Sequence, residues 1–185
     1  ADISKGSCDK AKTNISLYGL NDKIDVRCGN GLEIIKDSEI IDTIIISGMG
    51  GLLTIDVLKS NEKAVKNANQ LILQPQRDIE KVRAYLHSIN YKIINEEMLM
   101  ESGKYYTIIN AVKGSDEEYS EIEYYFGKFL LNKKSAVLKK FIDHEYKKIN
   151  IVLDNISNNA VENADKRISQ LKHLKSLYEE ALKCL

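Results

Sequence analysis

One stretch of the sequence decides the fold: Asp42-Thr43-Ile44-Ile45-Ile46-Ser47-Gly48-Met49-Gly50-Gly51-Leu52-Leu53. Its run of isoleucines predicts a strand over 43–47 that is buried on both faces, as in parallel sheets. The glycines end this strand, and the apolar residues of 52–59 predict a helix after it. A strand, a glycine turn and a helix together form the carboxyl edge of an α/β sheet, where ligands bind. We therefore expect this turn to border the active site.

The segments around this turn repeat the same pattern of strands and helices. Apolar residues at helical spacing predict four helical segments, over 4–18, 32–36, 61–67 and 78–90. Alternating or short apolar runs predict four further strands, over 23–28, 70–75, 91–100 and 104–112. The last two strands are joined by Glu101-Ser102-Gly103 and form an antiparallel pair. This order predicts a doubly wound α/β sheet that is mostly parallel with an antiparallel edge.

The composition of the chain changes at Gly114. Residues 115–123 hold five carboxylates and no basic residue, whereas 128–148 hold seven lysines. Heptad spacing predicts two helices, from Leu138 to Ile156 and from Val161 to Leu185, separated by Ser157-Asn158-Asn159. We expect an α/β domain over 1–113 and a helical coiled-coil hairpin over 114–185. The pattern leaves open whether the helices pair within one chain or between two, and so whether the protein is a monomer or a homodimer.

The composition also excludes several classes of protein. The chain of 185 residues carries 27 acidic and 27 basic side chains, which excludes a uniformly basic nucleic-acid binder but allows a local basic patch. No apolar run approaches the roughly 18 residues that indicate a transmembrane helix. Cys8, Cys28 and Cys184 show no CxxC spacing, so we expect no zinc site, no disulfide framework, and reduced thiols in a cytoplasm. The three histidines lie far apart, so no catalytic triad or metal site is predicted.

Chemically useful residues fall at the carboxyl ends of successive strands. They are Asp2-Ile3, Cys28-Gly29-Asn30-Gly31, Ser47 to Gly51, and Gln74-Pro75-Gln76. An acid after an early strand can accept hydrogen bonds from both ribose hydroxyls of a nucleoside, and an amide in the next turn can bind an adenine edge. Gly48 and Gly50 would let a planar or charged ligand approach the backbone closely. The pattern is that of a nucleoside site.

Each of these features has a simpler interpretation. Asp2 could be a polar chain end, the loop at 29–31 a plain turn, and the glycines at 48–51 close packing of a helix on a strand. A dinucleotide-binding fingerprint fails because Leu53 stands where its third glycine belongs, and there is no P-loop. A nicotinamide dehydrogenase is therefore disfavoured.

Two features outside the strand ends could contact RNA. Lysine pairs on the predicted helices could follow phosphates, although a solvated helix face explains them equally well; they are Lys133-Lys134, Lys139-Lys140 and Lys147-Lys148. Tyr105 could stack on a base. Because neighbouring residues of a strand face opposite sides, one of Tyr105 and Tyr106 faces the core.

Five motifs, taken in order, give the chain a family resemblance. They are Asp2 after a strand, Cys28-Gly29-Asn30-Gly31-Leu32, Ile46-Ser47-Gly48-Met49-Gly50-Gly51, Leu73-Gln74-Pro75-Gln76 and Glu101-Ser102-Gly103-Lys104-Tyr105-Tyr106. Together they resemble the bacterial TrmK-type tRNA (adenine-N1)-methyltransferases, which modify adenine 22, over nearly the whole chain. The resemblance implies a class I, Rossmann-like methyltransferase fold, S-adenosylmethionine as cofactor and tRNA as substrate.

The resemblance also implies roles for single residues. Asp2, with Ile3 beside it, would hold the ribose hydroxyls, and Gly29, Asn30, Gly31 and Leu32 would surround the adenine of the cofactor. Ser47, Gly48, Met49 and Gly50 would lie between the methionine moiety and the incoming base, where related enzymes hold the target amine with backbone carbonyls. The coiled coil would help to grip tRNA, with the lysine pairs and Tyr105 as contacts.

Two departures from the family pattern have consequences. Asn30 stands where aspartate is usual, so weaker cofactor binding is expected. The family fold also has an earlier strand and a glycine loop before Asp2, so we expect an N-terminally incomplete chain in which the strand at 43–47 has an unpaired apolar edge. The alternative function is a non-catalytic module that binds RNA or protein on the same scaffold.

Overall fold

A computed structural model describes residues 1–158 and 165–185 of the chain. In this part of the chain, one sheet is formed by the strands β1 (Thr43–Met49), β2 (Gln70–Pro75), β3 (Tyr91–Glu101) and β4 (Lys104–Lys113). Their order is β1-β2-β4-β3. β1 pairs with β2 in parallel, whereas β4 lies antiparallel to both β2 and β3. The predicted antiparallel hairpin is confirmed, but the sheet is mixed rather than mostly parallel, because β4 returns from the hairpin and inserts beside β2.

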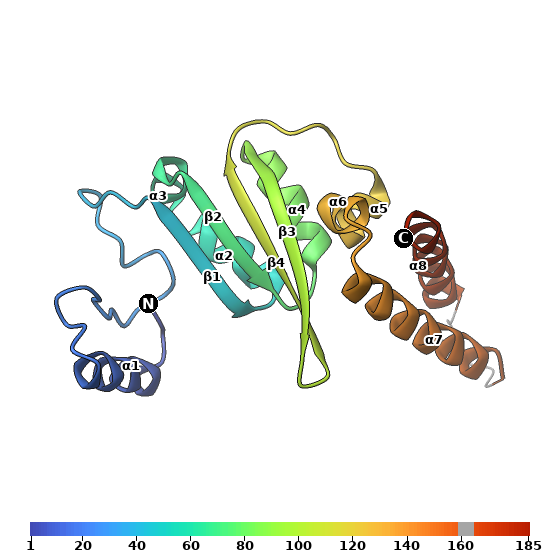
Figure 1. Ribbon diagram of the computed structural model, residues 1–185, viewed down its shortest axis with the longest axis horizontal. Helices are drawn as coiled ribbons and strands as arrows, with labels where there is room; N and C mark the ends of the chain where they lie inside the picture. The colour runs from blue at the N-terminus through green and yellow to red at the C-terminus, as the bar shows by residue number, and fades with distance from the viewer. Residues whose placement is uncertain (159–164) are drawn as a thin grey trace.

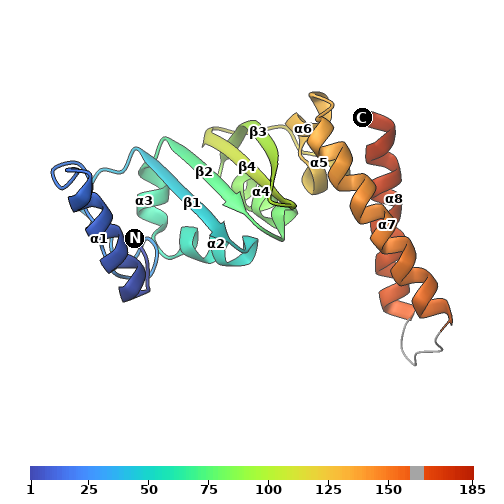
Figure 2. The same cartoon turned by 60° about the horizontal axis from the view of Figure 1, so that its bottom comes forward.

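Helices cover one face of this sheet: α2 (Gly51–Lys59), α3 (Glu62–Asn67) and α4 (Ile79–Ser88) (Figures 1 and 2). Ile44 and Ile46 of β1 point to that side and are buried in the same core as Leu58 and Leu86. Ile45 points to the other side and is 68% exposed. The prediction that this strand is buried on both faces is therefore wrong, because the covering helices pack on one face only.

Residues 1–42 lie beyond the β1 edge of the sheet (Figure 1). They include α1 (Lys5–Leu17), which begins at its N-cap Ser4, as predicted. The strand predicted over 23–28 does not form, and its place is taken by a single bridge between Asp2 and Cys28. The reason is that the backbone at Cys28 meets only the short segment around Asp2, which cannot extend a ladder. The helical segment predicted over 32–36 is reduced to turns.

Among the described residues, four helices lie beyond the β3 side of the sheet (Figure 1): α5 (Glu121–Phe126), α6 (Lys128–Asn132), α7 (Ala136–Asn158) and α8 (Asp165–Cys184). The two long helices share a second core, to which α7 contributes Ile142 and Ile149 and α8 contributes Leu171 and Tyr178. The predicted positions Asn159, Val161 and Ala164 lie outside the described residues. In the part that is described, no helix has the length and apolar character needed to cross a membrane.

A buried ion pair joins the sheet to these C-terminal helices. The Arg83 Nε of α4 donates to the Glu96 Oε1 of β3 at 2.7 Å, and both side chains are at most 1% exposed. The other carboxylate oxygen, Glu96 Oε2, accepts from the Phe129 backbone N–H at 3.3 Å. Arg83 Nη1 also donates to the carbonyls of Tyr124 and Tyr125, at 2.6 and 3.1 Å. One charged pair therefore holds α4, β3, α5 and α6 together.

Candidate active site

The end of β1 forms a bulge. Ser47 pairs with Gln74 and Met49 pairs with Pro75, so Gly48 is left out of the register between them. Gly48 has a φ of 80°, a left-handed conformation that glycine adopts without strain. An added Cβ at Gly48 would meet no atom within 4 Å, and both Ser47 and Gly48 are exposed. The backbone at this point is open to a ligand.

The next two glycines serve a different purpose. A Cβ at Gly51 would lie 2.5 Å from the carbonyl oxygens of Arg77 and Asp78, and the Gly51 N–H donates to the Arg77 carbonyl at 2.8 Å. Gly51 is therefore needed for packing of α2 against the start of α4. At Gly50, the N-cap of α2, a Cβ would lie 2.9 Å from Arg77 Nε. Close packing thus explains Gly51, although its neighbour is the backbone just before α4 rather than a strand, and it does not apply to Gly48.

The loop at 28–31 lies directly beside Asp2. The Asp2 carbonyl accepts from the Gly29 N–H at 3.0 Å, and the Asp2 N–H donates to the Arg27 carbonyl at 3.3 Å. The Asp2 carboxylate accepts from the Ser4 N–H at 2.8 Å, and the Asn30 side chain donates to Glu33 Oε1 at 2.7 Å. The structure therefore places the backbone of Asp2 beside the loop that carries Asn30, whereas the Asp2 carboxylate and the Asn30 amide each form a hydrogen bond within their own segment.

This loop packs against α2, the helix that follows the bulge. Gly31 has a φ of 52°, and a Cβ there would lie 2.8 Å from Val57 Cγ1 of α2. The Leu32 carbonyl accepts from Asn61 Nδ2 at 3.2 Å, just beyond the end of that helix. The predicted cofactor loop and the predicted catalytic turn are thus positioned by the same helix. Ile3, in contrast, is 78% exposed.

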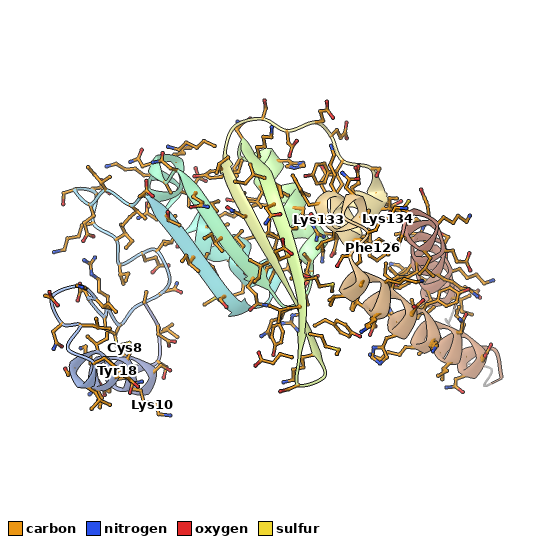
Figure 3. All side chains as sticks on the ribbon, in the orientation of Figure 1. Cys8, Lys10, Tyr18, Phe126, Lys133 and Lys134 are labelled. Atoms are coloured by element: carbon orange, nitrogen blue, oxygen red, sulfur yellow. A yellow bond between two sulfur atoms is a disulfide. The ribbon has the colours of Figure 1, made fainter. Side chains whose placement is uncertain are left out.

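An ion pair and a disulfide brace the loop. Arg27 donates to both carboxylate oxygens of Glu39, at 2.8 and 2.6 Å, and the hydrogen bond from Arg27 lowers the pKa of Glu39 to about 2. A disulfide joins Cys8 of α1 to Cys28, whose Cα atoms are 6.0 Å apart. The expectation of reduced thiols without a disulfide is therefore wrong for this pair. Sequence spacing could not reveal the pair because only the fold brings Cys8, labelled on α1 in Figure 3, to residue 28.

The predicted RNA-binding lysines differ in their partners. Three of them form ion pairs: Lys133 with Glu97, Lys139 with Asp143, and Lys148 with Glu145. Lys134, Lys140 and Lys147 are exposed and form no ion pair with the described residues. Figure 3 shows Lys133 and Lys134 at the end of α6, on the side of the molecule away from α1. In each adjacent lysine pair, one lysine is therefore bound to a carboxylate and the other has no acidic partner among the described residues.

Tyr105 lies at the junction of the hairpin and α7. Its ring packs edge to face on Phe141, with centroids 5.3 Å apart, and lies 6.3 Å from the His144 ring. It lines a pocket of about 260 Å³ that also includes Arg77, Phe141 and Tyr178. Arg77, which sequence reasoning missed, therefore touches both this pocket and Gly50. Its only sequence signal is its place just after Gln74-Pro75-Gln76, at the end of a strand.

Comparisons with known proteins match nearly the whole chain. A sequence model of one protein family, described as TrmK: tRNA (adenine(22)-N(1))-methyltransferase, matches residues 1–179. The tRNA (adenine(22)-N(1))-methyltransferase of Bacillus subtilis (strain 168) is 33% identical over 187 residues, which cover 98% of this chain and 78% of that protein.

Two solved structures have the same fold as this chain. A Streptococcus agalactiae protein of the NADB-Rossmann superfamily superposes with a TM-score of 0.89 and 31% identity, over 98% of this chain and 78% of that chain. Streptococcus pneumoniae Sp1610, a putative tRNA (m1A22) methyltransferase solved in complex with S-adenosyl-L-methionine, gives a TM-score of 0.87 and 28% identity, over 98% and 78% of the two chains.

Proposed function

Because the chain belongs to the TrmK family of tRNA (adenine(22)-N(1))-methyltransferases, we propose that the bulge at the end of β1 is where a methyl group passes to N1 of a tRNA adenine. The fold is a Rossmann-like methyltransferase fold with a mixed sheet, and the enzyme depends on S-adenosylmethionine. The observation that carries the proposal is the open backbone at Gly48, which lies just before α2, the helix whose Val57 packs against the loop of Asn30 next to Asp2.

The residues fit the nucleoside part of the cofactor. We assign the ribose hydroxyls to the exposed carboxylate of Asp2, because a carboxylate accepts hydrogen bonds from both hydroxyls. The Asn30 carbonyl oxygen can accept from the adenine amine, and Gly29, Gly31 and Leu32 shape the loop around it. A Cβ at Gly29 would overlap Ile34 Cγ2, so a larger residue there would displace the Ile34 side chain from the loop.

The chemistry of methyl transfer places modest demands on the protein. S-adenosylmethionine would supply an electrophilic methyl group on its sulfonium. The lone pair of adenine N1 would form the new N–C bond as the C–S bond breaks, and S-adenosylhomocysteine would leave with the electron pair of that bond. No side chain has to remove a proton from N1 before the attack. The contribution of Ser47, Gly48, Met49 and Gly50 is therefore to hold the base at the right distance and angle and to exclude water. The exposed carbonyl-bearing backbone of the bulge suits this task.

The tRNA contacts extend from this edge to the C-terminal helices. We propose that 1–113 forms the catalytic unit and that 114–185 forms a helical unit whose long helices make a coiled-coil hairpin. Arg77 lies over Gly50 and also lines the pocket beside Tyr105. A bound tRNA that contacts Arg77 could therefore reach both the bulge and the C-terminal helices. On α7, Lys140 and Lys147 are seven residues apart and share a face, on which His144 lies between them. We assign tRNA phosphates to this face.

Replacing Lys140 and Lys147 together by alanine is expected to weaken tRNA binding and to lower the slope of log K against log salt by about 0.9 for each phosphate that is no longer neutralised. Both ammonium groups lack an acidic partner among the described residues, so their charge is available to RNA. Filter binding at several salt concentrations measures the slope. The matched control is Lys139→Ala with Lys148→Ala, whose lysines are paired to Asp143 and Glu145. Equal slopes for the two double variants would contradict the assignment.

Calorimetry with S-adenosylhomocysteine separates the enzyme from a non-catalytic module. We expect tight binding by the protein expressed from the complete coding sequence, weakened about 10- to 100-fold in Asp2→Ala by the loss of charge-assisted hydrogen bonds. Asp9→Ala, an exposed position on α1, is the control and should bind like the wild type. Absence of binding by the wild-type protein would support the module instead, and unchanged binding by Asp2→Ala would refute the ribose assignment.

A further inference from the structure

The side chain of Gln74 holds the bulge of β1 from the neighbouring strand. Gln74 Oε1 accepts two hydrogen bonds, from the Gly48 backbone N–H at 2.9 Å and from Ser47 Oγ at 3.1 Å. A backbone N–H can only donate, so the Gln74 atom that faces it has to be the oxygen. The orientation of the amide is therefore determined by chemistry. Because Gly48 lies out of register with β2, a side chain takes the place of the missing ladder partner.

This hydrogen bond determines the direction of the peptide group between Ser47 and Gly48. The peptide is trans, so the Ser47 carbonyl points opposite to the Gly48 N–H in the same plane. The N–H is directed toward β2 by Gln74, so the carbonyl is directed away from β2. On that side of β1 lie residues 1–41, with the loop assigned to the cofactor (Figure 1). The Ser47 carbonyl is thus oriented toward the side on which the methyl donor is proposed to bind.

The other end of the same amide has no partner. Gln74 Nε2 is buried and makes no hydrogen bond with any described residue. A buried donor without a partner destabilises the fold, so a leucine or methionine would be favoured here if packing were the only requirement. The glutamine is better explained by what its oxygen does for the bulge.

We propose that Gln74 is a positioning residue for methyl transfer, which fixes the Ser47–Gly48 peptide so that the Ser47 carbonyl can hold the amine of the target adenine. The inference rests on the proposed function of the bulge and adds the residue that gives it one conformation. Without the acceptor at Gln74, the peptide can rotate about its neighbouring torsions, because Gly48 is compatible with many conformations. The adenine would then bind without a fixed angle to the methyl group, and the rate would fall.

Two substitutions of similar size test this role. Gln74→Met removes the acceptor, whereas Gln74→Glu keeps acceptor oxygens for both the Gly48 N–H and the Ser47 hydroxyl. We expect Gln74→Met to lower kcat about 100-fold, with the Kd for S-adenosylhomocysteine within about threefold of the wild type. Gln74→Glu should restore kcat to within about tenfold of the wild type. Hydrogen exchange of the Gly48 amide should be slow in the wild type and in Gln74→Glu, and fast in Gln74→Met.

The other outcomes overturn the inference. A Gln74→Met enzyme with wild-type kcat, or one whose Gly48 amide remains protected, would show that the bulge keeps its conformation without the Gln74 acceptor. A Gln74→Met protein that loses cofactor binding, or a Gln74→Glu protein as slow as Gln74→Met, would show that the glutamine acts in some other way. These results differ from a failure of the proposed function itself, in which the wild-type protein would form no 1-methyladenosine in tRNA.

Discussion

Replacing Gly50 by valine is expected to lower kcat for tRNA methylation by at least about 100-fold, while the Kd for S-adenosylhomocysteine changes by less than about threefold. A Cβ at Gly50 would lie 2.9 Å from Arg77 Nε, so valine displaces the Arg77 side chain. The valine side chain then occupies space at the surface that the target adenine must approach. The backbone at Gly50, with φ of −69° and ψ of 151°, suits valine, so the substitution does not strain the turn. Steady-state kinetics and calorimetry measure the two quantities.

Two further variants show how the valine acts. Arg77→Ala leaves Gly50 intact and removes the displaced side chain, so a similar loss of kcat would assign the effect to Arg77. Gly51→Ala is the structural control, because its Cβ would collide with the carbonyl oxygens of Arg77 and Asp78 at 2.5 Å and should lower the melting temperature. Unchanged turnover of Gly50→Val would mean that Gly50 does not form part of the surface that the target adenine approaches.

Replacing Glu96 by alanine is expected to lower the free energy of unfolding by about 3–5 kcal/mol. The substitution leaves the Arg83 guanidinium buried without its countercharge and removes the acceptor of the Phe129 N–H. A Cβ at Gly127 would lie 2.5 Å from the Glu96 carboxylate, so α5 and α6 are fitted closely around this group. Urea unfolding followed by circular dichroism measures the change.

The matched control for Glu96→Ala is Glu97→Ala, the next residue along β3. The Glu97 side chain is 59% exposed in its ion pair with Lys133, so its removal should cost no more than about 1 kcal/mol. A loss below about 1 kcal/mol for Glu96→Ala would contradict the account of the buried pair. The double variant Arg83→Met with Glu96→Leu, which replaces both charges by apolar groups, should recover much of the stability.

Local patterns in the sequence predicted most of the elements but not what packs on them. The isoleucines of 44–46 and the amphipathic spacing of Ile79, Val82 and Leu86 are local signals, and β1 and α4 form where they predicted. The exposure of Ile45 depends on which face the helices cover, and that is a tertiary property. The strand predicted over 23–28 had the right alternation, but a strand also needs a partner of similar length, and only Asp2 is beside it.

In the candidate site, local sequence patterns likewise identified the residues but not the contacts that their side chains make. The glycines of 48–51 share one sequence motif, yet Gly48 faces open space and Gly51 faces the backbone of Arg77 and Asp78, just before α4. Adjacent lysines are equivalent in the sequence pattern, but Lys133 is paired with Glu97, thirty-six residues away in the sequence. The hydrogen bonds of Gln74 with Ser47 and Gly48 cross between two strands, so no local pattern could predict them.

The transfer of labelled methyl groups to tRNA tests the central claim most directly. The protein from the complete coding sequence is incubated with methyl-labelled S-adenosylmethionine and unmodified tRNA, and the tRNA is then digested to nucleosides. A tRNA with guanosine in place of adenine 22 serves as the control. We expect the label in 1-methyladenosine, and no label in the guanosine-substituted tRNA. Label in any other nucleoside, or equal labelling of the two tRNAs, would contradict the proposed function.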